Sequence, residues 1–176
     1  MVGDSFTFID KNSLDDFGIK VVANDSFLPQ KRERKIAIPG VSGMYDYGAK
    51  NYEERLLTIT CVLTKKLTRA ETREIAYWLS RKGRLTLWDE QDKYYIAEIY
   101  DSVDLETMPK ETMREFELHF TAEPFAYKDI GYTEITNTVT KIAYKGTAET
   151  PCLLVLKNES NQPIKIATIT ATKRRR

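Results

Sequence analysis

Hydrophobic and polar residues alternate regularly over residues 52–63. Leu57, Ile59, Cys61 and Leu63 occupy every second position, and threonines stand at two of the positions between them. Successive side chains of a β-strand point to opposite faces, so this pattern predicts a long strand with one face in the core.

A second alternating run covers residues 114–120. Phe116, Leu118 and Phe120 share one face, whereas His119 falls on the other face with two glutamates. Strands of a sheet with one face in water show this pattern. The run therefore predicts another core strand, with His119 facing solvent.

Four shorter β-prone runs complete the predicted sheet. They lie at residues 6–9, 19–22, 85–88 and 94–100. The last two are joined by a polar segment that contains Asp89, Glu90 and Asp92. This segment lacks the glycine and the distal glutamate of an EF-hand, so we interpret it as the exposed tip of a β-hairpin.

One amphipathic helix is predicted at residues 69–82. Thr68, with a glutamate three residues later, matches a capping box. Ile75 and Trp78 lie on one face because they are three residues apart. Gly83 follows at a position where a left-handed residue often ends a helix.

Residues 39–51 are predicted to form a loop with unusual apolar and aromatic content. Exposed loops of this kind often contact partners. The candidate contact residues are Pro39, Gly40, Val41, Gly43, Tyr45 and Tyr47. A second interpretation stays open, in which the loop folds back and Tyr45 and Tyr47 cover the edge of its own sheet.

Composition and charge place the chain among ordinary globular proteins. Of its 176 residues, 41% are hydrophobic and 30% are charged, and the formal net charge is +1. Disordered chains are more polar, and nucleic-acid binding normally draws on an excess of basic residues. No segment has the length and apolar character of a signal peptide or a membrane helix.

The sequence offers little material for a metal, cofactor or catalytic site. Cys61 and Cys152 lie far apart in apolar runs, without the spacing of zinc ligands, and are predicted to pack in the core. The single histidine, His119, has no serine or cysteine nucleophile in a recognised motif beside it. No phosphate-binding glycine motif is present, so no cofactor and no enzymatic activity are expected.

Three tyrosines offer rings that could stack on single-stranded nucleic acid. They are Tyr94, Tyr95 and Tyr100, within one β-prone run. Packing in the core or at an interface is the favoured interpretation, because the net charge provides no general attraction for phosphates.

The composition changes after Pro124–Phe125. Threonine, isoleucine and asparagine then dominate, in β-prone pieces at residues 136–142, 151–156 and 164–170. These pieces predict a short second β unit, so we expect domains at residues 1–130 and 131–176. The basic end, Lys173–Arg176, is interpreted as a frayed terminus in preference to a phosphate contact.

Several short motifs follow one another in a characteristic order. They are Lys11–Ile19, Ile38–Gly43, the strand at residues 52–63, Trp78–Leu79, Leu85–Asp89, Phe116–Phe120 and Glu123–Phe125. In this order they resemble the N-terminal domain of the phage distal tail protein family, over residues 1–130. Residues 137–155 are similar to the opening of that family's galectin-like C-terminal sandwich, which is incomplete in this chain.

The resemblance implies a fold that is mainly β with one α-helix. The first domain would be a β-sandwich or split barrel like that of tail-tube proteins, and a short, incomplete β unit would follow. The resemblance also implies a virion protein, made in the cytoplasm of the bacterial host, that forms a hexameric ring at the distal end of a long non-contractile tail. Such a ring joins the tail tube to the adsorption apparatus, meets tape-measure and receptor-binding proteins, and leaves a channel for DNA. No reaction, cofactor, metal or membrane anchor is implied.

Two other functions stay open at this point. A carbohydrate-binding module at the periphery of a baseplate predicts exposed aromatic residues in the second unit, where Tyr144 is the only aromatic residue after Tyr132. A small hydrolase predicts a pocket with convergent ionisable groups, and His119 would be its base.

Overall fold

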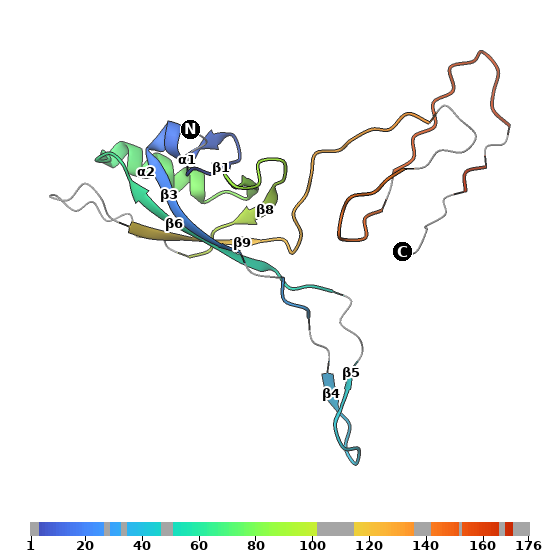
Figure 1. Cartoon of the computed structure of the whole chain (residues 1–176), viewed down its shortest axis with the longest axis horizontal. Coiled ribbons are helices and arrows are strands. Elements are labelled where there is room, and N and C mark those ends of the chain that lie inside the picture. Colours follow the sequence, from blue (N-terminus) through green and yellow to red (C-terminus); the bar gives the residue numbers. More distant parts are fainter. Residues whose placement is uncertain are drawn as a thin grey trace. The chain divides into compact units, whose positions relative to one another are not determined.

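The computed structural model of this chain describes residues 4–26, 29–32, 35–46, 51–101, 115–135, 142–151, 153–165 and 168–170. The chain divides into two units, Met1–Thr136 and Asn137–Arg176, whose residues mainly contact others of the same unit. The first unit holds the helices and strands that are described below (Figure 1).

The first unit is built on a seven-stranded antiparallel sheet with the order β2-β1-β7-β8-β9-β6-β3. The strands are β1 (Thr7–Phe8), β2 (Lys11–Asn12), β3 (Ile19–Ser26), β6 (Arg55–Leu63), β7 (Gly83–Thr86), β8 (Tyr95–Glu98) and β9 (Glu115–Ala122). The described residues also form two helices, α1 (Ser13–Phe17) and α2 (Arg69–Leu79). The prediction of a mainly β fold is confirmed.

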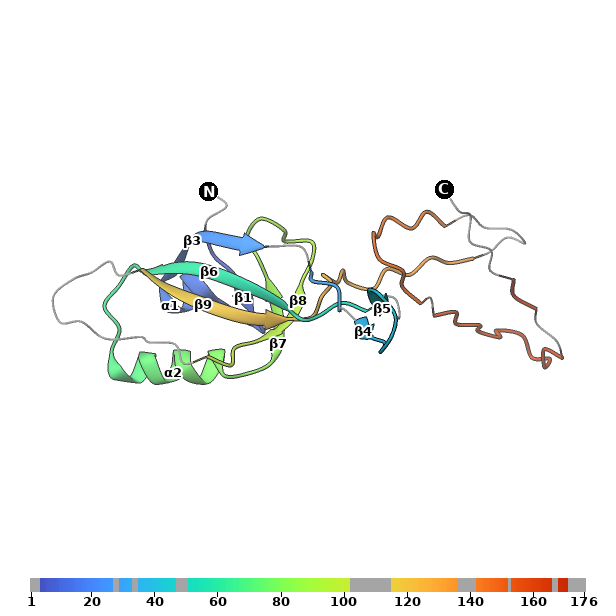
Figure 2. The ribbon, with the colours of Figure 1, turned by 90° about the horizontal axis from the view of Figure 1, so that it is seen from below.

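Strand β6 lies between β3 and β9, and these three strands form the longest part of the sheet (Figure 2). Cys61 of β6 is opposite Val21 on one side and opposite Phe116 on the other. Leu57, Ile59 and Cys61 are buried, as their alternation predicts. The pairing register of β3 shifts after Val21 at a β-bulge.

An aromatic cluster fills the core on one face of the sheet. Trp78 of α2 stacks on Phe6 with 5.7 Å between ring centroids, and its ring lies 4.6 Å from that of Phe17. Its indole Nε1 donates a hydrogen bond of 2.8 Å to the carbonyl oxygen of Phe8. The hydrogen bond satisfies the one polar atom of this buried side chain, so both packing and a hydrogen bond hold α2 against the sheet.

Helix α2 begins as predicted but ends earlier. Thr68 and Glu71 form the capping box, and the helix stops at Leu79. The prediction that Gly83 is a left-handed cap is wrong, because Gly83 is the first residue of β7. A glycine is required there for space, since a Cβ atom would lie only 2.4 Å from Cγ1 of Ile9.

Helix α1 is a short element that the hydrophobic pattern did not predict. Asn12 caps its first turn by accepting hydrogen bonds from the amides of Leu14 and Asp15. Gly18 ends the helix with φ of 69°, a left-handed conformation that glycine adopts without strain. Asn12 and Gly18 therefore cap a helix of about one turn.

The hairpin predicted from the runs at residues 85–88 and 94–100 is confirmed, because β7 pairs with β8. Two lysines pair with carboxylates of its acidic tip: Lys93 with Glu90, and Lys128 with Asp92. The four side chains are 38–70% exposed, which supports the interpretation of an exposed tip.

The second unit contains no helix or strand among residues 142–151, 153–165 and 168–170. The β-prone segments at residues 151–156 and 164–170 are therefore not strands within the described part of this unit. Apolar side chains such as Leu153 and Val155 are exposed there. Residues 136–141, Cys152 and Lys173–Arg176 lie outside the described residues.

Candidate interaction surface

A second, two-stranded sheet lies between β3 and β6 in the sequence (Figure 1). Strand β4 (Lys35–Ala37) pairs with β5 (Met44–Asp46), so that Ile36 is opposite Tyr45 and Ala37 is opposite Met44. The prediction of a loop over residues 39–51 is therefore wrong at β5, where the chain forms a hairpin strand.

Glycine makes the tip of this β4–β5 hairpin possible. The amide of Val41 donates a hydrogen bond of 3.2 Å to the carbonyl oxygen of Ile38, which closes a turn. Gly40 and Gly43 have φ of 83° and 97°. Side chains at both positions would force strained left-handed backbone, so glycine is the residue that permits this turn.

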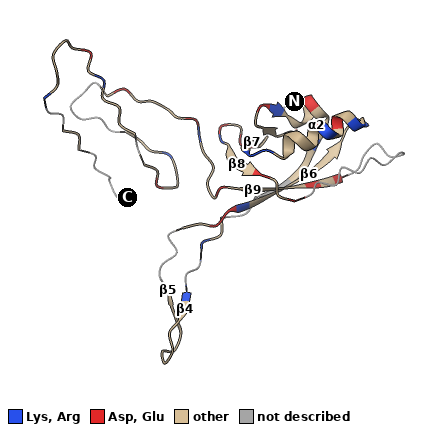
Figure 3. Cartoon of the chain, turned by 180° about the vertical axis from the view of Figure 1, so that it is seen from behind, with Lys and Arg blue, Asp and Glu red and all other residues tan. Residues whose placement is uncertain are grey.

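Apolar side chains of the hairpin are exposed to solvent. Val41 is 62% exposed, Met44 is 67% exposed and Tyr45 is 56% exposed. No charged residue stands between Lys35 and Asp46, and Figure 3 shows the hairpin tip without charge. An uncharged apolar surface of this kind is typical of contact sites for other macromolecules.

The structure places most of the predicted contact residues on this hairpin. Pro39, Gly40, Val41 and Gly43 lie at its tip, Tyr45 lies in β5, and Tyr47 lies outside the described residues. The exposure of Tyr45 contradicts the alternative in which it covers the edge of the core.

Three further exposed residues of the hairpin were not among the sequence candidates. They are Ile36, Ile38 and Met44. The sequence could have indicated them, because the run without charged residues begins at Ile36 and so covers the whole hairpin, not only its glycine-rich half.

The base of the hairpin is held by backbone pairing and one ion pair. Lys31 and Tyr52 form an isolated antiparallel bridge. The Arg32 guanidinium donates two hydrogen bonds to the Glu53 carboxylate, at 2.7 and 3.2 Å. This contact lowers the pKa of Glu53 and raises that of Arg32. The chain segments that precede and follow the hairpin in the sequence are therefore paired with each other.

His119 alternates with the buried residues of β9, as predicted, but its side chain is only 35% exposed. Its Nδ1 is 3.2 Å from the hydroxyl oxygen of Thr58, and its Nε2 is 3.6 Å from a carboxylate oxygen of Glu117. The three side chains are placed like nucleophile, base and acid, but 3.6 Å is too long for a hydrogen bond. None of the three side chains lines the pocket beside β1 and β7 that is described below.

Cys61 is a buried thiol of the core. Burial raises its pKa to about 12, which keeps the thiol protonated and unreactive near neutral pH. No group of three or more histidine, cysteine, aspartate or glutamate side chains is placed to hold a metal ion in the described part of the chain. Neither described helix is long and apolar enough to cross a membrane.

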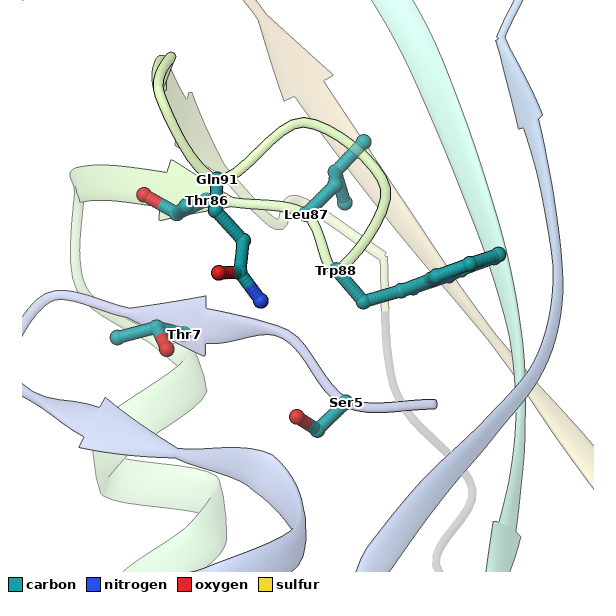
Figure 4. Close-up of a pocket in the computed structure, with 6 residues that line it drawn as sticks. All are labelled: Ser5, Thr7, Thr86, Leu87, Trp88 and Gln91. Atoms are coloured by element: carbon teal, nitrogen blue, oxygen red, sulfur yellow. The ribbon is translucent and has the colours of Figure 1, made fainter. Parts of the chain in front are cut away.

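A polar pocket of about 310 Å³ opens beside β1 and β7 (Figure 4). Its lining residues are Ser5, Thr7, Thr86, Leu87, Trp88 and Gln91. None of these side chains is an acid or base near neutral pH, so the pocket lacks a group for acid–base catalysis.

The three tyrosines considered for stacking do not form one platform. Tyr95 is buried, and Tyr100 donates a hydrogen bond of 2.6 Å to Glu98. Tyr94 stacks on Tyr127, with 5.9 Å between ring centroids. The backbones of Tyr94 and Tyr127 also exchange two hydrogen bonds, which anchor the segment after β9 to the first unit.

Comparison with known proteins places this fold in a family. The family described as "Phage tail protein RIFT-related domain" matches residues 8–122. A search of curated proteins found no match.

Among solved structures, the chain is similar to SPP1 Dit (gp 19.1), described as a paradigm of the hub adsorption apparatus in phages that infect Gram-positive bacteria. The TM-score is 0.53 and the sequence identity is 17%, over 70% of this chain and 51% of that chain. This similarity shows a shared fold, and the chain spans about half the length of that protein. Because the family match covers most of the chain, this protein belongs to the phage tail proteins with a RIFT-related domain.

Proposed function

We propose that this protein is a structural component at the distal end of a long, non-contractile phage tail. In this proposal, copies of the chain form a hexameric ring that joins the tail tube to the adsorption apparatus and leaves a channel for DNA. The ring would also meet the tape-measure and receptor-binding proteins. The chain would be made in the bacterial cytoplasm and would have no enzymatic role.

The observation that carries this proposal is the exposed β4–β5 hairpin on a fold of the phage tail family. Its apolar side chains gain nothing from solvent, whereas contact with another molecule would bury them. A hairpin that projects such a surface from one copy and rests on a different surface of the next forms a heterologous contact. Repetition of a heterologous contact closes into a ring when the rotation between copies permits it.

The hub described for SPP1 Dit supports the distal position. We further propose that residues 1–130 form the part that builds the ring and that residues 131–176 begin a separate C-terminal unit, whose described residues form no strand within this chain. The division between Thr136 and Asn137 is close to that boundary and supports it.

Light scattering over a series of concentrations, with negative-stain images, tests the ring. We expect closed rings with roughly six times the protomer mass of 20.3 kDa. Open filaments would contradict closure of the contact. A protein that stays monomeric at the highest concentrations would contradict assembly through its own hairpin.

A further inference from the structure

Helix α2 presents an outward face with three arginines and one tyrosine. Arg69, Arg73, Tyr77 and Arg81 follow one another at intervals of four residues, which places them along one side of the helix and its end. All four are exposed, and Tyr77 is 70% exposed. The opposite side of α2 carries its buried residues, so this face is free of the core.

Both carboxylates of α2 already form ion pairs with lysines outside the helix. Glu71 accepts a hydrogen bond of 3.0 Å from Lys65 and also closes the capping box. Glu74 accepts one of 2.5 Å from Lys11. Among the residues that the structure describes, no carboxylate pairs with Arg69, Arg73 or Arg81.

The positions of two arginines are unfavourable in the isolated protein. Arg69 is the first residue of the helix, where the partial positive charge of the helix dipole is located. Arg73 stands four residues later, so the two like charges are neighbours on the helix surface. An anionic partner would relieve both repulsions at once.

The surroundings of the arginines allow a close approach. Ala70, Ala76 and Ser80 are exposed between them and have short side chains. Arginine binds carboxylates through its fork of donors, and tyrosine and arginine are among the residues that contribute most to binding energy at interfaces. The face therefore offers positive charge, an exposed aromatic ring and enough room for a partner to approach.

We propose that this face of α2 is a docking surface for a row of carboxylates on another protein. A nucleic acid is disfavoured because Glu71 and Glu74 flank the stripe, and basic and acidic positions lie close together along α2 (Figure 3). A helix of this length offers about 16 Å, which suits a single protein segment. The surface lies on a different element from the β4–β5 hairpin, so its test is independent of ring formation.

A synthetic helical peptide with glutamate at every fourth position is the probe, and the same peptide with glutamine is its control. Binding of the labelled peptides to the full chain is followed by fluorescence anisotropy at two salt concentrations. We expect the glutamate peptide to bind, more weakly at higher salt, and the glutamine peptide to bind at least about tenfold more weakly.

The double variant Arg69→Gln/Arg73→Gln should reduce affinity for the glutamate peptide by about tenfold or more, and Tyr77→Ala by a smaller factor. Lys145→Gln/Lys165→Gln removes the same charge from exposed positions of the second unit and should leave the affinity within about twofold. Thermal unfolding checks that all variants fold.

Three results would overturn the proposal. The first is equal binding of the glutamate and glutamine peptides. The second is unchanged affinity in the Arg69→Gln/Arg73→Gln variant. The third is tighter binding of a DNA duplex than of the glutamate peptide to the same face, which would assign the arginines to phosphates.

Discussion

The seven-stranded sheet and the β4–β5 hairpin carry the same kinds of side chain but bury them to opposite extents. Ile59 of the sheet is 1% exposed, whereas Ile36 of the hairpin is 54% exposed. Tyr95 is 6% exposed, whereas Tyr45 is 56% exposed. Hydrophobic character alone therefore does not decide whether a side chain of this protein is buried.

The difference follows from the number of layers available to each region. Strand β6 has a neighbour on both sides, and the aromatic cluster around Trp78 covers one of its faces. Among the described strands, β4 and β5 pair only with each other. No second layer of the described residues covers these two strands, so their apolar side chains stay exposed in the single chain.

Trp78→Ala should produce the largest loss of stability. Removal of the indole leaves a cavity among Phe6, Phe8 and Phe17 and should lower the free energy of unfolding by about 3–5 kcal/mol. Tyr45→Ala is the matched change in the hairpin and should stay within about 0.5 kcal/mol. Chemical denaturation measures both, and similar losses would contradict the contrast between the two regions.

Gly83→Ala should have the next largest effect. The new Cβ atom would meet Ile9 at the junction of β1 and β7, and we expect a loss of about 1–3 kcal/mol in the free energy of unfolding. Gly131→Ala is the control, because no atom lies within 4 Å of a Cβ atom placed there. If both variants unfold at the same denaturant concentration, close packing at Gly83 is not what stabilises this edge.

Tyr127→Ala tests the anchored segment after β9. Loss of stacking on Tyr94 and of the 2.5 Å hydrogen bond to Glu123 should cost about 1 kcal/mol. Tyr132→Ala changes a residue that is 87% exposed and should have no measurable effect. Limited proteolysis should also reach residues 123–129 faster in the first variant, and unchanged cleavage would show that the side chain does not anchor the segment.

Glu71→Gln should have the smallest effect, and one that depends on pH. The Thr68 amide and the Lys65 ammonium lower the pKa of Glu71 from 4.5 to about 2. Because the folded pKa is the lower one, this contribution to stability is present above pH 4.5 and is lost as the pH falls towards 2. Wild type should be more stable than the variant at pH 7, and the difference should shrink below pH 4.5. A constant difference across that range would exclude the ionised carboxylate as its source.

The core strands and the start of α2 could be predicted because local patterns determine them. Leu57, Ile59 and Cys61 alternate over a long run, and the Thr68 capping box is a local motif. The role of Gly83 could not be predicted, because its neighbour Ile9 is far away in sequence. Strand β5 could not be predicted from the hydrophobic pattern. Its partner β4 is short and both faces of the pair are exposed, so the sequence lacks the alternation that is typical of a half-buried strand.

The double variant Val41→Asp/Met44→Asp tests most directly whether the hairpin is covered by another copy. Its mass by light scattering should fall to that of the 20.3 kDa protomer, because two buried charges would oppose the contact. Ile130→Asp changes a side chain that is 78% exposed outside the hairpin and should keep the mass of the wild-type assembly. A double variant that keeps the wild-type mass would contradict assembly through this surface.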